Sequence, residues 1–123
     1  MAFYKSKHYE NAIQKVRIEL GTMFGLEKDE EAFILLREPS EVESLSFKKE
    51  ITTDEVKGVE FFKSILPGLI LDHDFYEDET SKTKMSNEEV AELIFDKNEA
   101  ADHVLETYTN AVFRSRLNKK EGK

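Results

Sequence analysis

The sequence predicts one mainly α-helical domain over residues 1–123, a small bundle of about four helices with a short N-terminal β-hairpin packed on it. Two observations predict this fold class. Apolar residues recur at helical spacing over most of the chain after Pro39, and Ser/Thr-x-x-Glu capping boxes stand in front of these segments. The composition agrees, because a charged share of 36% fits long solvated helix faces and 39% hydrophobic residues supply a core.

The N-terminal segment, residues 1–30, carries no single periodic pattern, and its structure stays open. Within it, residues 15–20 (KVRIEL) alternate charged and apolar side chains, which is typical of a half-buried strand. Residues 32–36 (AFILL) form a short apolar run, typical of a buried strand. We expect the two segments to pair as the hairpin, which must pack on the helices because an isolated hairpin is marginal in water.

A helical core is expected over residues 32–117, followed by a frayed basic tail over residues 118–123. The first helix begins at a capping box, in which the Ser40 side chain accepts from the third helical N–H and Glu43 reaches back. Three apolar residues of this helix are expected to face inward: Val42, Leu45 and Phe47.

The second helix is predicted to begin at another capping box, Thr52 to Glu55. Its apolar residues fall on one helix face, which consists of Val56, Val59, Phe62, Ile65 and Leu66. Pro67 disfavours the helical conformation for the residue before it, and Gly68 can adopt positive φ. We therefore expect this helix to end at the Pro-Gly pair.

A third capping box, Ser86 to Glu89, precedes an apolar face that continues to Val112. Asp96, Lys97 and Asn98 interrupt it, so we expect two helices, residues 87–96 and 98–117, with Asn98 capping the second.

Between the second and third helices, residues 72–84 are predicted to form an acidic loop that also contains aromatic residues. Phe75 and Tyr76 follow an aliphatic run closely enough to fold back as a lid on the core, or they form a contact for a partner. On the preceding helix, Phe61 points about 100° away from Phe62 and either packs on another element or is exposed for a partner. The candidate partner-binding residues are Phe61, Phe75, Tyr76, Asp72 and Asp74.

Charge and composition exclude several classes of function. The net charge is −8, and residues 61–112 carry twelve acidic and four basic side chains, so nucleic-acid binding is not expected. No apolar run approaches the ~20 residues of a membrane span, and no signal peptide is expected over residues 1–20. The absence of Cys removes disulfides and thiolate sites and fits either a reducing cytoplasm or a virion part.

The sequence has no recognisable catalytic motif, and we expect no enzyme activity, no cofactor and no metal. His103 shares a helix face with Glu99 and Glu106, and we interpret this trio as a solvated mixed-charge face. A calcium loop starting at Asp72 fails at its sixth position, Glu77, which should be Gly, and at its twelfth, which should be Glu. A metal-dependent hydrolase that uses the loop acids and His73 lacks supporting residues.

Five short segments occur in an order that is similar to one known family. These are residues 35–40 (LLREPS), 61–67 (FFKSILP), 70–76 (ILDHDFY), 85–94 (MSNEEVAELI), and a closing helix through Val104, Leu105 and Tyr108. Over residues 32–112 this order resembles the small tail assembly chaperones of siphovirus-type bacteriophages and prophages. The strand-like segments of the first 30 residues depart from a purely helical family fold.

The resemblance implies a small, acidic, mainly helical chaperone in the cytoplasm of the bacterial host. Such a protein binds the tape-measure protein, recruits tail-tube subunits and is absent from the mature virion. The family also implies a longer frameshifted form, for which Lys119 and Lys120 offer a site for ribosomal slippage, and association into homo-oligomers. The alternative is a non-catalytic structural virion or adaptor protein, such as a head–tail completion protein.

Overall fold

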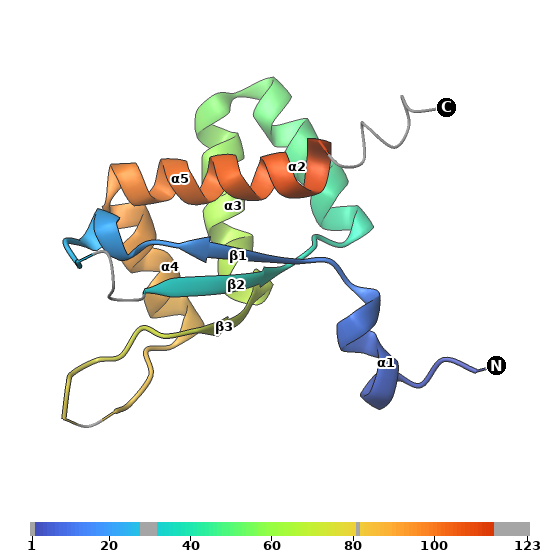
Figure 1. Cartoon of the computed structure of the whole chain (residues 1–123). Coiled ribbons are helices and arrows are strands. Elements are labelled where there is room, and N and C mark those ends of the chain that lie inside the picture. The colour runs from blue at the N-terminus through green and yellow to red at the C-terminus, as the bar shows by residue number, and fades with distance from the viewer. Residues whose placement is uncertain (1, 28–31, 81, 115–123) are drawn as a thin grey trace.

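The computed structural model describes residues 2–27, 32–80 and 82–114. Figure 1 shows helices gathered on one side of a small sheet, with one helix set apart at the N-terminal end. In chain order the elements are α1 (Lys5–Ala12), β1 (Lys15–Glu19), the 3₁₀ turn η1 (Gly21–Phe24), β2 (Phe33–Arg37), α2 (Glu41–Thr53), α3 (Glu55–Leu69), β3 (Ile70–His73), α4 (Asn87–Asp96), α5 (Asn98–Thr109) and the π-helical turn η2 (Asn110–Arg114). The predicted tail, residues 118–123, lies outside the described residues.

The sheet is antiparallel with the strand order β1-β2-β3. The predicted hairpin is confirmed, since β1 pairs with β2 from Lys15 opposite Arg37 to Glu19 opposite Phe33. The third strand is a correction, because Asp72 and His73 belong to β3 and the acidic loop therefore begins later than predicted. A mainly helical domain with a hairpin is thus the right coarse description, but the sheet has three strands.

Side chains of α2 to α5 form the core together with the inner face of the sheet. Phe62 of α3 is 2% exposed and lies at its centre. Its ring centroid lies 5.6 Å from that of Tyr108 and 6.1 Å from those of Phe47 and Phe95. This ring cluster joins α2, α3, α4 and α5, as aromatic pairs at 4.5–7 Å do in protein cores.

The capping boxes at Ser40 and Ser86 are confirmed, with Glu43 and Glu89 as their third helical residues. The predicted box at Thr52 is wrong, because Asp54 is the N-cap of α3 and its carboxylate accepts the N–H of Val56 at 2.8 Å. The predicted Asn98 cap is also wrong. Lys97 occupies the N-cap position of α5, without a side-chain cap bond, and Asn98 is the first helical residue.

The end of α3 differs from the prediction, because the helix continues through Pro67 and Gly68 to Leu69. Two distant side chains bind its last carbonyl groups and remove the need for a glycine cap. Asn87 donates from Nδ2 to the carbonyls of Pro67 and Ile70, at 3.1 Å each, and Arg37 donates from Nε to that of Gly68 at 3.1 Å. Strand β3 therefore begins directly after the helix.

Three predicted core residues point outward. Val42 and Leu45 of α2 are 73% and 56% exposed, and Val56 of α3 is 64% exposed. Helix α2 packs mainly against α3, so only the narrow stripe with Phe47 and Ser44 is covered. Apolar character alone did not identify the buried face of this helix.

Candidate functional site

None of the helices that the structure describes covers the outer face of the sheet (Figure 1). Inward side chains of β1 and β2 are buried, whereas the alternate ones are exposed or half-buried. A β-bulge adds to this surface, because the register passes from Leu35 opposite Asp72 to Leu36 opposite Ile70 and leaves Leu71 without a partner. Leu71 and Asp72 are consequently both exposed. We call this surface the open face; it comprises Lys15, Arg17, Phe33, Leu35, Leu71 and Asp72.

Charged side chains bracket the apolar part of the open face. The guanidinium of Arg17 lies 3.8 Å from the ring centroid of Phe33, a cation–π contact, and its Nε donates to Glu19 at 2.7 Å. At β3, Lys84 Nζ donates to Asp72 at 2.9 Å. This hydrogen bond holds the pKa of the Asp72 carboxyl below its usual value and raises the pKa of Lys84. Because both side chains are about half exposed, the pair contributes little to stability.

The acidic loop, defined here as residues 74–85, is anchored where it leaves β3. The Asp74 carboxylate accepts the backbone N–H of Phe33 at 2.7 Å and so continues the β2–β3 ladder. Phe75 is 8% exposed, and its ring meets Phe24 edge-on, with centroids 5.8 Å apart and planes at 85°. Of the two alternatives for Phe75 and Tyr76, the lid on the core is therefore confirmed for Phe75, which is not exposed for a partner, but it is wrong for Tyr76, which is 47% exposed.

A buried histidine closes the base of the acidic loop. His73 is 4% exposed, and its Nε2 lies 2.9 Å from the carbonyl oxygen of Met85. Its Nδ1 accepts the N–H of Phe75 at 3.0 Å, so the ring uses the tautomer with the proton on Nε2. One side chain thus joins the two ends of the loop. Both ring nitrogens of His73 are therefore engaged by backbone groups of the loop.

Beyond these anchors the acidic loop forms a short two-stranded stem. Tyr76 and Lys84 form an antiparallel bridge, and the N–H of Glu77 donates to the carbonyl of Thr83 at 2.9 Å. Tyr76 is 47% exposed and borders a hollow of about 430 Å³, which is also lined by Asp78, Glu79 and Lys82. The stem therefore holds an accessible ring beside carboxylates.

Four of the five predicted partner-binding residues lie on neighbouring parts of the chain. Asp72 is on β3, and Asp74, Phe75 and Tyr76 are in the acidic loop. Of these, Asp72 and Tyr76 are exposed, whereas Phe75 is in the core and Asp74 binds β2. Phe61 belongs to α3, is half-buried and packs against the core. The sequence analysis missed Leu35 and Leu71 as surface residues; Leu35 belongs to the apolar run of residues 32–36, which predicted a buried strand.

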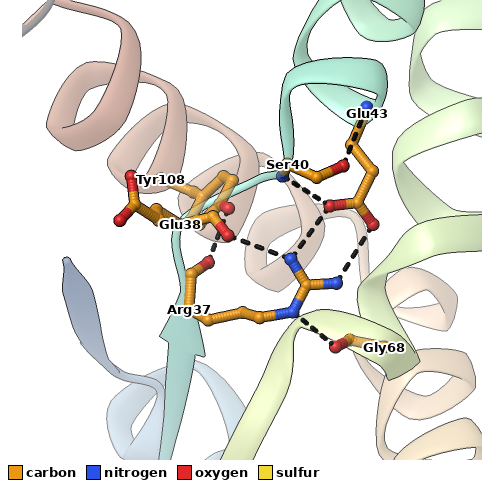
Figure 2. Close-up of polar contacts among 6 residues, drawn as sticks. All are labelled: Arg37, Glu38, Ser40, Glu43, Gly68 and Tyr108. Atoms are coloured by element: carbon orange, nitrogen blue, oxygen red, sulfur yellow. Dashed lines mark hydrogen bonds and ion pairs between the residues drawn. The ribbon is translucent and has the colours of Figure 1, made fainter. Parts of the chain in front are cut away.

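A separate polar cluster surrounds Arg37 at the other end of β2 (Figure 2). Its guanidinium binds the Glu43 carboxylate through two hydrogen bonds, of 2.9 and 3.1 Å, and donates to the carbonyls of Glu38 and Gly68. The hydroxyl of Tyr108 donates to the Arg37 carbonyl at 2.7 Å. The side-chain hydrogen bonding between Arg37 and Glu43 lowers the pKa of Glu43 and raises that of Arg37. This cluster therefore joins β2 to α2, α3 and α5.

Within the part of the chain that the structure describes, no three His, Cys, Asp or Glu residues are arranged to hold a metal ion, and the trio around His103 is no exception. In the same residues, no helix combines the length and apolar character that a bilayer span requires. Comparison of the chain with protein-family models, with curated proteins and with solved structures gives no match.

Proposed function

We propose that this protein is a tail assembly chaperone of a siphovirus-type phage or prophage. It acts by binding, without catalysis, in the cytoplasm of the bacterial host. It holds the tape-measure protein, recruits tail-tube subunits and leaves before the virion is mature. The proposal rests on the order of short segments over residues 32–112 and on the surface of the acidic loop.

The observation that carries the proposal is the setting of Tyr76. Its ring is 47% exposed and lies beside Asp78 and Glu79 on a stem whose base is fixed by His73 and Asp74. Tyr is favoured at binding surfaces because its ring buries a large area at a low entropic cost. A ring on an anchored loop is already ordered before the partner arrives, which lowers the cost of binding.

Charge gives the second part of the argument. Residues 26–112 carry nine basic and 23 acidic side chains, which keep a complex with an apolar client in solution and attract its basic segments. A tape-measure protein consists of long hydrophobic helices, which an aromatic contact with an acidic surround can bind. We therefore expect the client to contact the acidic loop, with Tyr76 at the centre of the contact.

The proposal is tested by co-expression with a fragment of the tape-measure protein from the neighbouring gene. We expect the wild type to keep the fragment in solution and to co-purify with it. Tyr76→Ala is expected to lose the complex, whereas Val42→Ala, which truncates a 73% exposed side chain on α2, is expected to retain it. An insoluble fragment with the wild type, or equal retention by both variants, would contradict the proposal.

Departure from the finished tail is a separate part of the proposal. We expect mass spectrometry of purified particles to find the tape-measure and tail-tube proteins but not this chain. Its presence at a fixed copy number would instead favour a structural virion protein or a head–tail completion protein. The neighbouring genes give an independent check, since a tail-tube gene should precede and a tape-measure gene should follow.

A further inference from the structure

The N-terminal arm, defined here as residues 2–12, projects from the body of the protein. Figure 1 shows α1 beyond the ends of the strands and apart from the other helices. Three aromatic side chains of the arm are exposed: Phe3 at 61%, Tyr4 at 60% and Tyr9 at 41%. Such a density of exposed rings on eleven residues is typical of a surface that is covered by a partner.

The helix of the arm is not expected to be stable by itself. It has eight residues, no side-chain N-cap bond and no acidic residue in its first turn. Isolated helices of this length are marginal in water, so most of their stability comes from packing. The rings of Phe3 and Tyr4 contact only His8 among the ring contacts within the described chain, with centroids 5.7 and 5.9 Å away. The arm therefore needs a surface to pack on.

A matching hollow lies on the open face, beside the base of the arm. It has a volume of about 410 Å³ and is lined by Tyr9, Ile13, Lys15, Leu35, Leu71 and Asp72. Leu35 and Leu71 are its sheet-borne apolar part, while Lys15 and Asp72 add polar groups. The chemistry of this hollow suits an aromatic side chain with a polar tip.

The arm cannot fill the hollow of its own molecule with its tip. Tyr9 and Ile13, at the base of the arm, already form one wall. Helix α1 has eight residues and rises about 1.5 Å per residue, so it spans roughly 12 Å, and Phe3 and Tyr4 lie before its far end. The tip is thus free to reach another molecule.

We propose that the protein forms a two-fold dimer in which each arm places Phe3 and Tyr4 in the hollow on the open face of the other copy. Arm and hollow lie side by side on one chain, so a two-fold axis beside them brings each arm to the opposite hollow. Exchange of an identical element between two copies is a low-cost route to a dimer.

Charge and area both support a second copy as the occupant. The arm carries Lys5 and Lys7 against Glu10, a net charge of +1, whereas residues 26–112 carry 23 acidic and nine basic ones. The arm is therefore attracted to the acidic body of its partner. Phe3 and Tyr4 are 61% and 60% exposed, and an aromatic side chain buries about 150–250 Å² in full, so the four inserted rings remove roughly 400–600 Å² from solvent. The hollows that receive them lose a similar area, which brings the interface to the size of about 1,000 Å² that a specific dimer requires.

The test is the mass of the full chain in solution, measured by sedimentation velocity over a dilution series. We expect the wild type to be a dimer, and Phe3→Ala/Tyr4→Ala and Leu71→Asp each to be monomers. Both changes are at exposed positions, so circular dichroism should show an unchanged fold. Val42→Asp is the matched control, because it places the same charge on an exposed apolar site elsewhere and should leave the dimer intact.

Mixing the two monomeric variants tests whether the arm of one chain binds the hollow of the other, or whether each substitution weakens association in some other way. The Leu71→Asp chain keeps its arm and the Phe3→Ala/Tyr4→Ala chain keeps its hollow. A differently tagged mixture should therefore form mixed dimers, weaker than the wild type. A monomeric wild type, dimeric variants, or a mixture that stays monomeric would each overturn the proposal. No client is needed, so these results are independent of the co-expression test of the chaperone.

Discussion

Replacing Arg37 with Met removes four hydrogen bonds and keeps most of the apolar stem of the side chain. Two of these bonds join the guanidinium to the Glu43 carboxylate, and the others go to the carbonyls of Glu38 and Gly68. Because this cluster holds β2 against α2 and the end of α3, we expect Arg37→Met to lower the free energy of unfolding of the whole domain.

The magnitude follows from exposure. The side chains of Arg37 and Glu43 are 23% and 21% exposed, so water screens this pair only in part. Hydrogen bonds to charged groups contribute about 1.5–3 kcal/mol each when they are buried, and exposed ion pairs contribute about 0–1 kcal/mol. The bonds share one guanidinium and are not additive, so we expect a loss of about 2–3 kcal/mol.

The assay is urea unfolding followed by circular dichroism at pH 7. With a slope of about 1–3 kcal/mol per molar urea, the midpoint should fall by roughly 1–2 M. Lys84→Met is the matched control, because the Lys84–Asp72 pair has the same 2.9 Å separation but side chains that are 47% and 52% exposed. That midpoint should not change measurably. Equal midpoints for wild type and Arg37→Met would refute the reasoning.

The pH dependence gives a second readout of the same pair. The hydrogen bond from Arg37 lowers the pKa of Glu43 below its ordinary value. A carboxyl whose pKa is lower in the folded state stabilises the fold above the unfolded-state pKa, and this stabilisation is lost as the pH falls through the folded-state pKa. The difference in stability between wild type and Arg37→Met should therefore shrink from pH 7 to about pH 3. A difference that is constant over this range would contradict the assignment.

Three further predictions concern the core and the base of the acidic loop. Phe62→Ala should lower the free energy of unfolding by about 3–5 kcal/mol in urea titrations, because it empties the centre of the ring cluster. Gly58→Ala should lower the melting temperature, because its Cβ would lie 2.5 Å from Cδ1 and 2.8 Å from the backbone Cα of Ile51. Gly68→Ala, whose nearest contact is 3.9 Å away, should not lower it, and equal destabilisation of both glycine variants would contradict this account. His73→Leu should speed hydrogen exchange in residues 74–85 more than in α5, and uniform exchange rates would show that the histidine does not anchor the loop.

Local signals in the sequence predicted their elements well. The capping boxes at Ser40 and Ser86 are confirmed because every partner in them lies within three residues. The Thr52 box failed because Asp54 stands closer to the start of the helix, while the hydroxyl of Thr52 donates to carbonyls of α2. The capping-box pattern alone did not predict which of the neighbouring residues, Thr52 or Asp54, caps α3.

Signals that depend on distant residues were missed. Pro67 predicted a helix end, but Asn87 and Arg37 bind the last carbonyls of α3 from 20 and 31 positions away in the sequence. Strand β3 was missed because its four residues follow a helix directly and its bulge breaks the period-2 pattern. The hollow on the open face was missed because Leu35 and Leu71 are far apart in the sequence and are brought together only by the pairing of β2 with β3.

The candidate loop residues are neighbours in the sequence, so a local pattern was enough to propose them. Phe75 and Tyr76 were candidates as aromatic residues within an acidic segment, and Asp72 and Asp74 as the acidic residues beside them; the structure places the four on β3 and the adjoining loop. Their roles could not be separated from sequence, because burial of Phe75 and exposure of Tyr76 depend on the packing of Phe24 and on the stem.

The central claim is that this chain holds another polypeptide through the acidic loop. The most direct measurement is the affinity of the purified protein for a soluble tape-measure segment, by isothermal titration calorimetry. We predict binding that Tyr76→Ala weakens by about tenfold or more, as the loss of a central aromatic contact does, and that Val42→Ala leaves unchanged. Absence of binding by the wild type, or the same affinity for both variants, would contradict the claim.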